Sequence, residues 1–262
     1  MRALLDLFVP RHKSSGPKGR RMHMLADAWP SAIYAVGDVH GCLRQLRALE
    51  AGIIADAASL NGEKWLILLG DYVDRGPDSA AVIDHLLAAP PPGFRRICLA
   101  GNHEVMMQAF LESPNLSSQW LGLGGEETLL SYGIDIHSIA DRNSSPSQLR
   151  QILDAHIPQN HMAFLQSLPL SCSVGHLVFV HAGIRPGVEM AQQDEADLLW
   201  MRYNDEDPGP RDRTVVHGHT PAAKPLVLSN RICLDTGAFA TGILSAMRLH
   251  PADGRTLFQT AN

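Results

Sequence analysis

The chain has 262 residues, of which 45% are hydrophobic, so it suits a single domain with a sizeable core. Its formal net charge is −5, and residues 1–30 carry six Lys or Arg against two Asp, so the remaining 232 residues carry a net −9. A body this acidic lacks the basic face that nucleic-acid binding needs, so we expect no nucleic-acid partner.

Residues 1–30 form a basic segment that we expect to be a mobile tail. Its apolar run, residues 1–8, precedes most of the basic residues, whereas a secretory signal places its charge before the apolar core. No run approaches the ~20 apolar residues of a membrane span, so we expect no stable membrane insertion. A single short basic patch binds anionic lipid only weakly.

The four cysteines are spread along the chain, and no two of them form a C-x-x-C pair; they are Cys42, Cys98, Cys172 and Cys233. Two of them lie inside apolar strand patterns. This usage is typical of small buried thiols in a reducing compartment, and it argues against disulfides or a zinc site. We therefore expect a cytoplasmic location.

Residues 31–262 are expected to form one domain that begins with alternating strands and helices. Each short apolar run is followed by a loop and then by leucines or other apolar residues at helical spacing. The expected pairs are 32–37 with a helix from about 43, 65–70 with 79–89, and 95–100 with a helix from about 103. Strand, loop and helix repeated in this way predict a parallel sheet.

The segment of about 105–173 is mostly helical in pattern and is expected to form a cap on the sheet edge. Proline, a cluster of three glycines at 122–125 and a polar run at 141–147 interrupt it. Its apolar residues are expected either to line a substrate cleft or to pack the cap itself; the main ones are Trp120, Leu121, Leu123 and Tyr132. After the cap, strand-like runs predict a second, mixed sheet; they are 177–181, 213–217, 231–235 and 242–249.

Five apolar runs, each expected to form a buried strand, are followed closely by Asp, Asn or His. The sequences are IYAVGDVHG at 33–41, LILLGDYVDRGPD at 66–78, RICLAGNHE at 96–104, LVFVHAG at 177–183 and TVVHGHT at 214–220. Loops that follow strand ends are where open α/β sheets bind ligands. A single such turn is most often an ordinary surface turn, but five in one chain indicate a functional site.

Six of these residues offer oxygen or nitrogen atoms to a metal, and none of them is a cysteine; they are Asp38, His40, Asp71, Asn102, His181 and His219. Such a set suits hard or borderline divalent cations. Six ligands are too many for one metal that stays open to substrate, but they suit two metals that share a carboxylate. Two metals about 3.5–4 Å apart can bind the attacking and leaving oxygens of an in-line displacement and acidify a bridging water.

The motif series GDVHG, GDYVDRGPDS, GNHE, VHAG and VHGHT resembles that of the metal-dependent phosphoprotein phosphatases, which are calcineurin-like metallophosphoesterases. The likeness is greatest to their compact bacterial and phage branch, which includes serine/threonine phosphatases and symmetrical diadenosine tetraphosphatases. It covers about residues 34–249. The resemblance implies an α/β fold in which two sheets form a sandwich flanked by helices (αββα), with a small helical cap.

The resemblance also implies a role for each matching residue. Asp38 and His40 would hold one metal, Asp71 would bridge, and Asn102, His181 and His219 would hold the other. The metals would be Mn²⁺, with Fe, Zn, Ni or Co as alternatives. His103 would protonate the leaving oxygen, with Asp74 hydrogen-bonded to it. Arg75 and Arg202 would bind phosphate oxygens, whereas Arg185 is either a further phosphate ligand or a surface arginine.

Three functions stay open at this point. The one that the sequence favours is a serine/threonine or dual-specificity protein phosphatase that uses a hydroxide bridging the metals. The alternative is a symmetrical diadenosine tetraphosphate hydrolase or another small-molecule phosphoesterase, which needs an aromatic surface for adenine; Trp120, Tyr132 and Phe110 are the only nearby candidates. A binding protein with a dead site is disfavoured because every ligand is present. The substrate would be a phosphoprotein or a small phosphate, and no regulatory subunit is implied.

Overall fold

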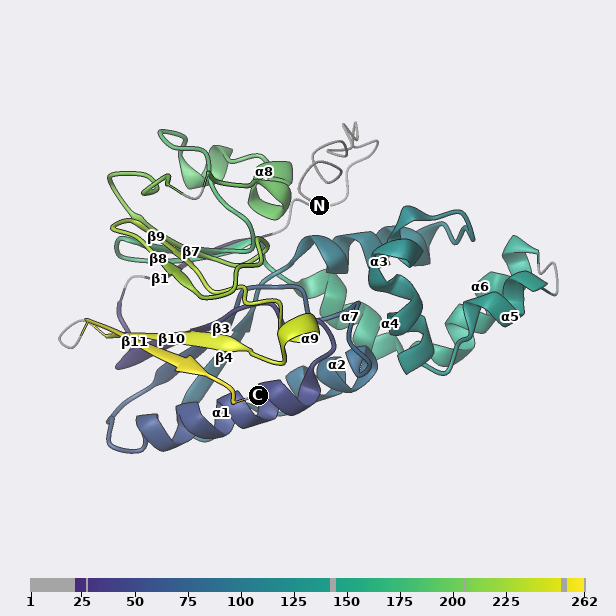
Figure 1. The fold of residues 1–262 in the computed structure, drawn as a ribbon, viewed down its shortest axis with the longest axis horizontal. Coiled ribbons are helices and arrows are strands. Elements are labelled where there is room, and N and C mark those ends of the chain that lie inside the picture. Colours follow the sequence, from purple (N-terminus) through teal and green to yellow (C-terminus); the bar gives the residue numbers. More distant parts are fainter. Residues whose placement is uncertain (1–21, 27, 142–144, 205, 251–253, 262) are drawn as a thin grey trace.

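The structure, a computed structural model, describes residues 22–262 apart from 27, 142–144, 205, 251–253 and 262. Two β-sheets pack face to face, with helices on their outer sides and a helical region beside them (Figure 1). The expected αββα sandwich with a helical cap is therefore confirmed. No helix among the described residues combines the length and apolar character that crossing a bilayer requires.

The first sheet has the strand order β11-β10-β2-β3-β4. Its strands are β2 (Ala32–Val36), β3 (Lys64–Leu68), β4 (Phe94–Cys98), β10 (Ser245–His250) and β11 (Gly254–Gln259). The first three run parallel, as expected, and are connected through α1 (Leu43–Ala57) and α2 (Ser79–Leu87). β2 and β3 are buried along their whole length, because both faces of a parallel sheet are covered.

The expected strand at 242–249 belongs to the first sheet, and not to the second sheet as the sequence analysis predicted. The run 242–249 was expected in the second sheet, but β10 pairs antiparallel with β2, with Ala246 opposite Val36. β10 also forms a hairpin with β11, a strand that the sequence pattern did not indicate. An apolar run shows that a strand is buried but not which free sheet edge it will join, and this explains the error.

The second sheet has the order β1-β5-β6-β7-β9-β8. Its strands are β1 (His23–Ala26), β5 (Ser171–Val174), β6 (Leu177–Val180), β7 (Thr214–His217), β8 (Leu226–Val227) and β9 (Arg231–Cys233). β1 pairs in parallel with β5, so residues 23–26 of the expected tail belong to the sheet. Residues 1–21 of that tail lie outside the described residues.

The core is divided by the first sheet. On its inner face, Ile33 and Ile67 pack with Phe179 and Val216 of the second sheet. On its outer face, Tyr34, Leu66 and Leu68 pack with apolar side chains of α1 and α2. Successive residues of a strand point to opposite faces, so one short strand serves both layers. Because both faces are packed, the carboxyl ends of these strands are held in fixed positions relative to the helices and to the second sheet.

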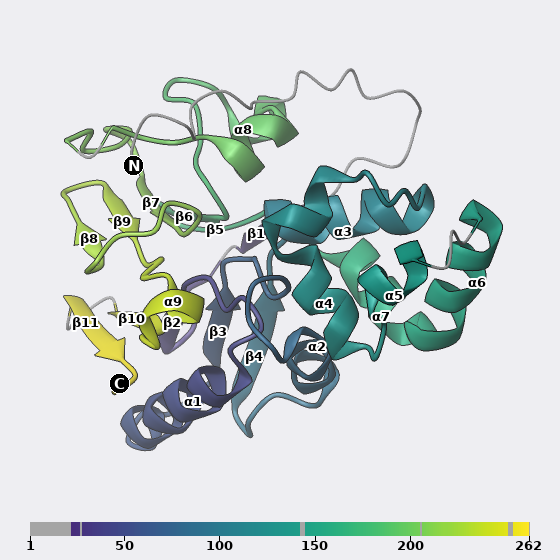
Figure 2. The same cartoon turned by 45° about the vertical axis from the view of Figure 1, so that its right-hand side comes forward.

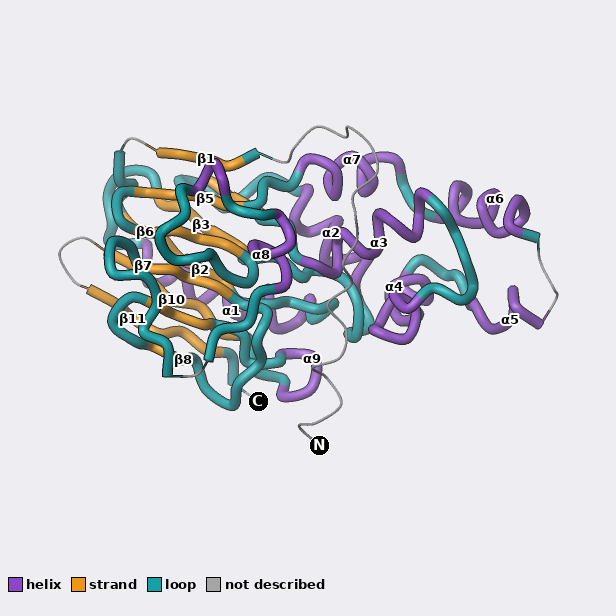
Figure 3. The backbone as a smooth tube through the Cα atoms, turned by 90° about the horizontal axis from the view of Figure 1, so that it is seen from above, coloured by secondary structure: helices purple, strands orange, loops and turns teal. Residues whose placement is uncertain are grey.

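The helical region lies between β4 and β5 in sequence and beside the sheets in space. It comprises α3 (Asn102–Glu112), the π-helical turn η1 (Leu121–Gly125), α4 (Glu126–Ser131), α5 (Ile136–Asp141), α6 (Pro146–His156) and α7 (Gln159–Ser167). Figure 3 shows α5 and α6 at the end farthest from the sheets. Shorter helices follow: η2 (Met190–Gln192), α8 (Glu195–Trp200) and α9 (Ala238–Thr241).

Two of the cap aromatics pack the helical region and do not line a cleft. The Trp120 side chain is buried, with its ring centroid 4.8 Å from that of Phe110. The Tyr132 hydroxyl lies 2.8 Å from Nδ1 of His161. Leu123, in contrast, is exposed and lines a pocket beside Arg75.

Candidate metal centre

Five loop residues adopt a backbone conformation that side chains other than glycine rarely adopt. Among the described residues, these are the non-glycine positions with positive φ: His40, Asp71, Asp74, Arg75 and His219, with φ between 43° and 74°. All five belong to the set that the sequence singled out. Left-handed backbone at non-glycine residues costs free energy and tends to occur at functional sites, where the surrounding structure holds it in place.

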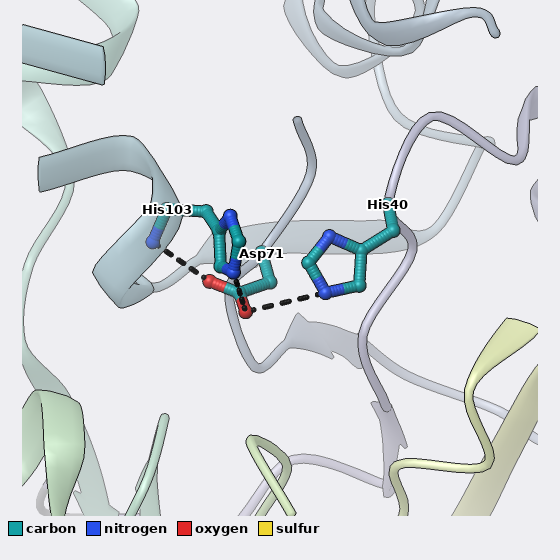
Figure 4. A group of neighbouring side chains, drawn as sticks. All are labelled: His40, Asp71 and His103. Atoms are coloured by element: carbon teal, nitrogen blue, oxygen red, sulfur yellow. Dashed lines mark hydrogen bonds and ion pairs between the residues drawn. The ribbon is translucent and has the colours of Figure 1, made fainter. Parts of the chain in front are cut away.

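The first group of candidate ligands gathers around one carboxylate. Figure 4 shows His40 and His103 on either side of Asp71, with ligand atoms of all three lying within 4.8 Å of one another. The distance from Asp71 Oδ2 is 3.4 Å to His40 Nε2 and 3.9 Å to His103 Nε2. His40 Nδ1 lies 2.8 Å from the Val73 carbonyl oxygen, to which it donates a hydrogen bond. In the neutral ring, Nε2 therefore keeps its lone pair for a metal.

The second group shares the same carboxylate, and combines Asp71 with His181 and His219. His181 Nδ1 donates to the Leu69 carbonyl, 3.0 Å away, which leaves Nε2 as an acceptor. That Nε2 atom lies 2.8 Å from Asn102 Oδ1, 3.2 Å from His219 Nδ1 and 3.4 Å from Asp71 Oδ1. With Nδ1 of His181 as the donor, its Nε2 and Asn102 Oδ1 are two acceptors in contact, and a cation between them would satisfy both, so these residues fit a metal.

Asp38 contacts the backbone of His219. Its Oδ2 accepts a hydrogen bond of 2.9 Å from the His219 backbone, whereas its buried Oδ1 has no hydrogen-bond partner. A buried carboxylate oxygen without a donor is costly unless a cation takes that position. Asp235, which the sequence analysis did not select, is buried beside Asp38, and its charge contributes to raising the Asp38 pKa. Its place after a strand, in LDTG, is the only sequence signal for it.

Burial shifts the pKa values of the carboxylates and imidazoles in this cluster. It raises the pKa of Asp38 well above the usual value and that of Asp71 to about 6. It lowers the pKa of His40 and His219 well below the usual value and that of His181 to about 4. Neutral imidazoles offer lone pairs, and crowded buried carboxylates require positive charge. Divalent cations would satisfy both, so the donor set fits two of them.

His103, whose Nε2 belongs to the first group, forms a short contact through its other ring nitrogen. Its Nδ1 lies 2.6 Å from Asp74 Oδ2, and both side chains are buried. Asp74 also accepts hydrogen bonds from Trp120 Nε1 at 2.7 Å and from Thr128 Oγ1 at 2.6 Å. Burial lowers the pKa of His103, and it raises that of Asp74 to about 7 against the effect of Thr128 and Trp120. Trp120 and Thr128 of the helical region therefore fix the Asp74 carboxylate, and this carboxylate in turn fixes the His103 ring.

Glu104 is a second residue that the sequence analysis passed over. Its fully buried carboxylate accepts backbone hydrogen bonds from Gly101 and Asp71 at 2.9 Å and from Tyr72 at 2.7 Å. One side chain thus fixes the loop after β3 against the start of α3. Its place in GNHE was visible, but its role was not, because the amides of Asp71, Tyr72 and Val73 that it binds lie 31–33 residues earlier.

Two glycines of the cap explain the cluster seen in the sequence. Gly124 has φ of 116°, and its carbonyl accepts a 3.2 Å hydrogen bond from the Arg75 backbone. A Cβ there would come within 2.5 Å of the Arg75 nitrogen, and one at Gly125 would lie 2.6 Å from the Trp120 ring. Only glycine allows η1 to pack this closely on the loop after β3.

The three candidate arginines occupy different environments. Arg75 Nη1 lies 2.8 Å from His40 Nε2, and its Nη2 lies 3.0 Å from His103 Nε2. Arg202 is exposed, and its positive charge is among the influences that lower the His219 pKa. The Arg185 guanidinium is exposed and paired with the Asp197 carboxylate. Arg75 therefore contacts the candidate ligands directly, and Arg202 lies near enough to influence His219. Arg185 instead pairs with Asp197 of α8.

Comparison with known proteins identifies the family. A model of the family described as calcineurin-like phosphoesterase matches residues 31–241. The chain belongs to the calcineurin-like phosphoesterases. Members of this family hydrolyse phosphoester bonds with a dinuclear divalent metal centre. The enzyme class expected from the sequence is therefore confirmed, and the two ligand groups could hold the metals that the family uses.

Two curated relatives match over most of their length. The asymmetrical bis(5'-nucleosyl)-tetraphosphatases PrpE of Anoxybacillus flavithermus and Geobacillus thermodenitrificans are each 26% identical to this phosphoesterase, over 81% of its chain and 88% of theirs. Among solved structures, a provisionally named diadenosine tetraphosphatase is 20% identical, with a TM-score of 0.62 over 93% of this chain and all of its own.

A serine/threonine phosphatase from Saccharomyces cerevisiae has a TM-score of 0.57 at 13% identity, over 92% of this chain and 84% of its own. At these identities, the two solved structures support the fold alone.

Proposed function

We propose that this phosphoesterase hydrolyses dinucleoside polyphosphates. The observation that carries the proposal is that two groups of candidate ligands share one residue, Asp71, beside the Arg75 guanidinium. Such a site suits a phosphate chain, whose negative charge needs cations at several oxygens. The choice of substrate is supported by the two relatives named as bis(5'-nucleosyl)-tetraphosphatases, which match along 88% of their length.

In this proposal each group has a definite role. Asp38, His40, Asp71, Asn102, His181 and His219 would hold two divalent cations, with Mn²⁺ as the expected metal. When bound, such cations acidify water and neutralise charge on the phosphoryl oxygens. Arg75 and Arg202 bind phosphate oxygens. His103 donates the proton on Nε2 to the leaving oxygen, while Asp74 holds the ring through Nδ1.

A second candidate is a serine/threonine protein phosphatase, and the His103–Asp74 contact favours it. An alkoxide leaves poorly without a proton, whereas a nucleotide phosphate leaves readily. A buried acid held at 2.6 Å by a carboxylate is therefore most useful for phosphate esters of serine or threonine. The two candidates use the same residues and differ in the leaving group.

Substrate preference separates the two candidates. The Mn²⁺-loaded enzyme would be assayed in parallel on diadenosine tetraphosphate, a phosphoserine peptide and p-nitrophenyl phosphate, with nucleotide products separated by chromatography. We expect the highest kcat/KM on the dinucleotide. Products of ATP and AMP would indicate asymmetrical cleavage, and two ADP would indicate symmetrical cleavage. A kcat/KM at least tenfold higher on the peptide would replace the first candidate with the second.

A further inference from the structure

An exposed aromatic ring lies beside the candidate metal centre, and none of the roles above uses it. Phe239, on α9, is 41% exposed. The Arg75 guanidinium carbon lies 4.9 Å from its ring centroid, and the His40 ring meets it edge-on at 5.4 Å. Phe239 therefore touches both a candidate metal ligand and the expected phosphate arginine, while much of its surface stays open to solvent.

The backbone around Phe239 is held firmly. α9 is a short helix between Gly237 and Gly242, both in the left-handed conformation. The Gly237 amide donates to the Asp235 carboxylate at 2.8 Å, and the Thr241 hydroxyl donates to the Thr236 carbonyl at 2.9 Å. Figure 1 shows α9 at the end of the sheets that faces the helical region, and in Figure 2 this end is turned forward. An aromatic residue on such a turn presents a preorganised surface to a ligand.

The ring forms one wall of a pocket of about 420 Å³ that also includes Arg75. Leu121 and Leu123 of η1 are the other apolar side chains that line it, and Leu123 is 43% exposed. Glu126, Glu127 and two glycines complete the lining among the residues that the structure describes, and Arg75 is the one cationic side chain of that set. Two carboxylates would repel a further phosphate group. The pocket suits an uncharged planar group attached to a phosphate that Arg75 binds.

We propose that this pocket binds a nucleobase, stacked on Phe239, of a nucleoside phosphate whose phosphoryl group lies at Arg75. The inference rests on the proposed function and specifies its substrate class, a phosphate that carries a nucleobase. Exposed aromatic faces bind bases by stacking, and the Glu126 and Glu127 carboxylates accept hydrogen bonds from an exocyclic amino group. The aromatic residues expected to offer such a surface, Trp120, Tyr132 and Phe110, instead pack within the helical region.

The test compares two competitors that differ only in the base. AMP and ribose 5-phosphate would compete with p-nitrophenyl phosphate on the Mn²⁺-loaded enzyme, with KM measured separately for each variant. Stacking of one base strengthens binding by about 5- to 150-fold. We expect AMP to bind more tightly than ribose 5-phosphate by a factor in that range. Phe239→Ala should remove most of the difference, and Phe239→Tyr should keep it.

Leu130→Ala is the matched control, because Leu130 is an exposed apolar residue of α4 outside the pocket. It should leave the ratio of the two competition constants unchanged. Equal constants for both competitors in the wild type would overturn the proposal. So would an equal weakening of both by Phe239→Ala, which would mean that the ring only orients Arg75. Turnover of diadenosine tetraphosphate is measured separately, so a failed nucleobase site and a failed dinucleotide activity are distinguishable.

Discussion

Replacing Trp120 by Phe should weaken the enzyme selectively on substrates with poor leaving groups. The Trp120 Nε1 donates to Asp74 Oδ2 at 2.7 Å, the same oxygen that contacts His103 Nδ1 at 2.6 Å. A hydrogen bond to a charged group contributes about 1.5–3 kcal/mol, which sets an upper range of about 10- to 150-fold. Because Thr128 still donates to the other oxygen, we expect about a tenfold loss on alkyl phosphates.

The loss of the Trp120–Asp74 hydrogen bond should also shift the pH dependence of the activity. Burial raises the pKa of Asp74 to about 7, and hydrogen bonds from Thr128 and Trp120 oppose this rise. Without the Trp120 donor, the Asp74 pKa should rise further, so the carboxylate becomes protonated at higher pH. The acidic limb of the kcat/KM profile on an alkyl phosphate should therefore move to higher pH in Trp120→Phe.

The assay is the ratio of kcat/KM on phosphoserine peptide to that on p-nitrophenyl phosphate, whose phenolate leaves readily. Phe110→Leu is the control, because Phe110 packs on Trp120 but forms no hydrogen bond to Asp74. It should lower Tm without changing the ratio. An equal loss on both substrates in Trp120→Phe, or a changed ratio in Phe110→Leu, would refute the idea that the cap positions the acid.

Three further predictions concern the candidate metal centre and the phosphate arginines. Chelation should abolish activity and lower Tm, because cations that bind only the folded state stabilise it; activity in protein shown to be metal-free by elemental analysis would contradict this. Asp71→Asn should lower turnover far more than Asp78→Asn, because Asp71 belongs to both ligand groups and Asp78 to neither; comparable kcat values at equal metal content would refute the shared role. Arg202→Ala should raise KM about tenfold. Arg185→Ala should change KM less than twofold, because its guanidinium is held by Asp197; a large Arg185 effect would restore it as a phosphate ligand.

The sequence predicted well those features that depend on neighbouring residues. Apolar runs that end in Gly-Asp or Asn-His marked β2, β3 and β4, since a buried strand and its exit loop are local patterns. The same reasoning could not place β10 in the first sheet, because the choice between sheet edges depends on partners far away in the chain. It could not find Phe239 either, because an isolated aromatic residue in a four-residue helix has no local pattern that shows which side chains it will contact.

Supporting residues escaped prediction for a related reason. Glu104 and Thr128 are ordinary residues of helical segments when they are considered alone. Their roles arise from hydrogen bonds that cross 31–33 residues for Glu104 and 54 residues for Thr128, to Asp74 and its neighbours. Ligand residues are recognisable because metal chemistry restricts their type, whereas residues that position them need only a donor or acceptor at the correct place.

The strained loop after β3 carries both the shared candidate ligand, Asp71, and the expected phosphate arginine, Arg75. Asp71, Asp74 and Arg75 all have positive φ, a conformation that an isolated loop would leave. Glu104 binds one end of this loop from α3, while Thr128 and Gly124 bind the other end from the cap. Since Asp71 would bridge the metals and Arg75 would bind phosphate, the cap contacts hold both groups in one geometry. In the proposed mechanism the helical cap would therefore contribute to the chemistry through the backbone that it fixes, even though Trp120 itself is buried.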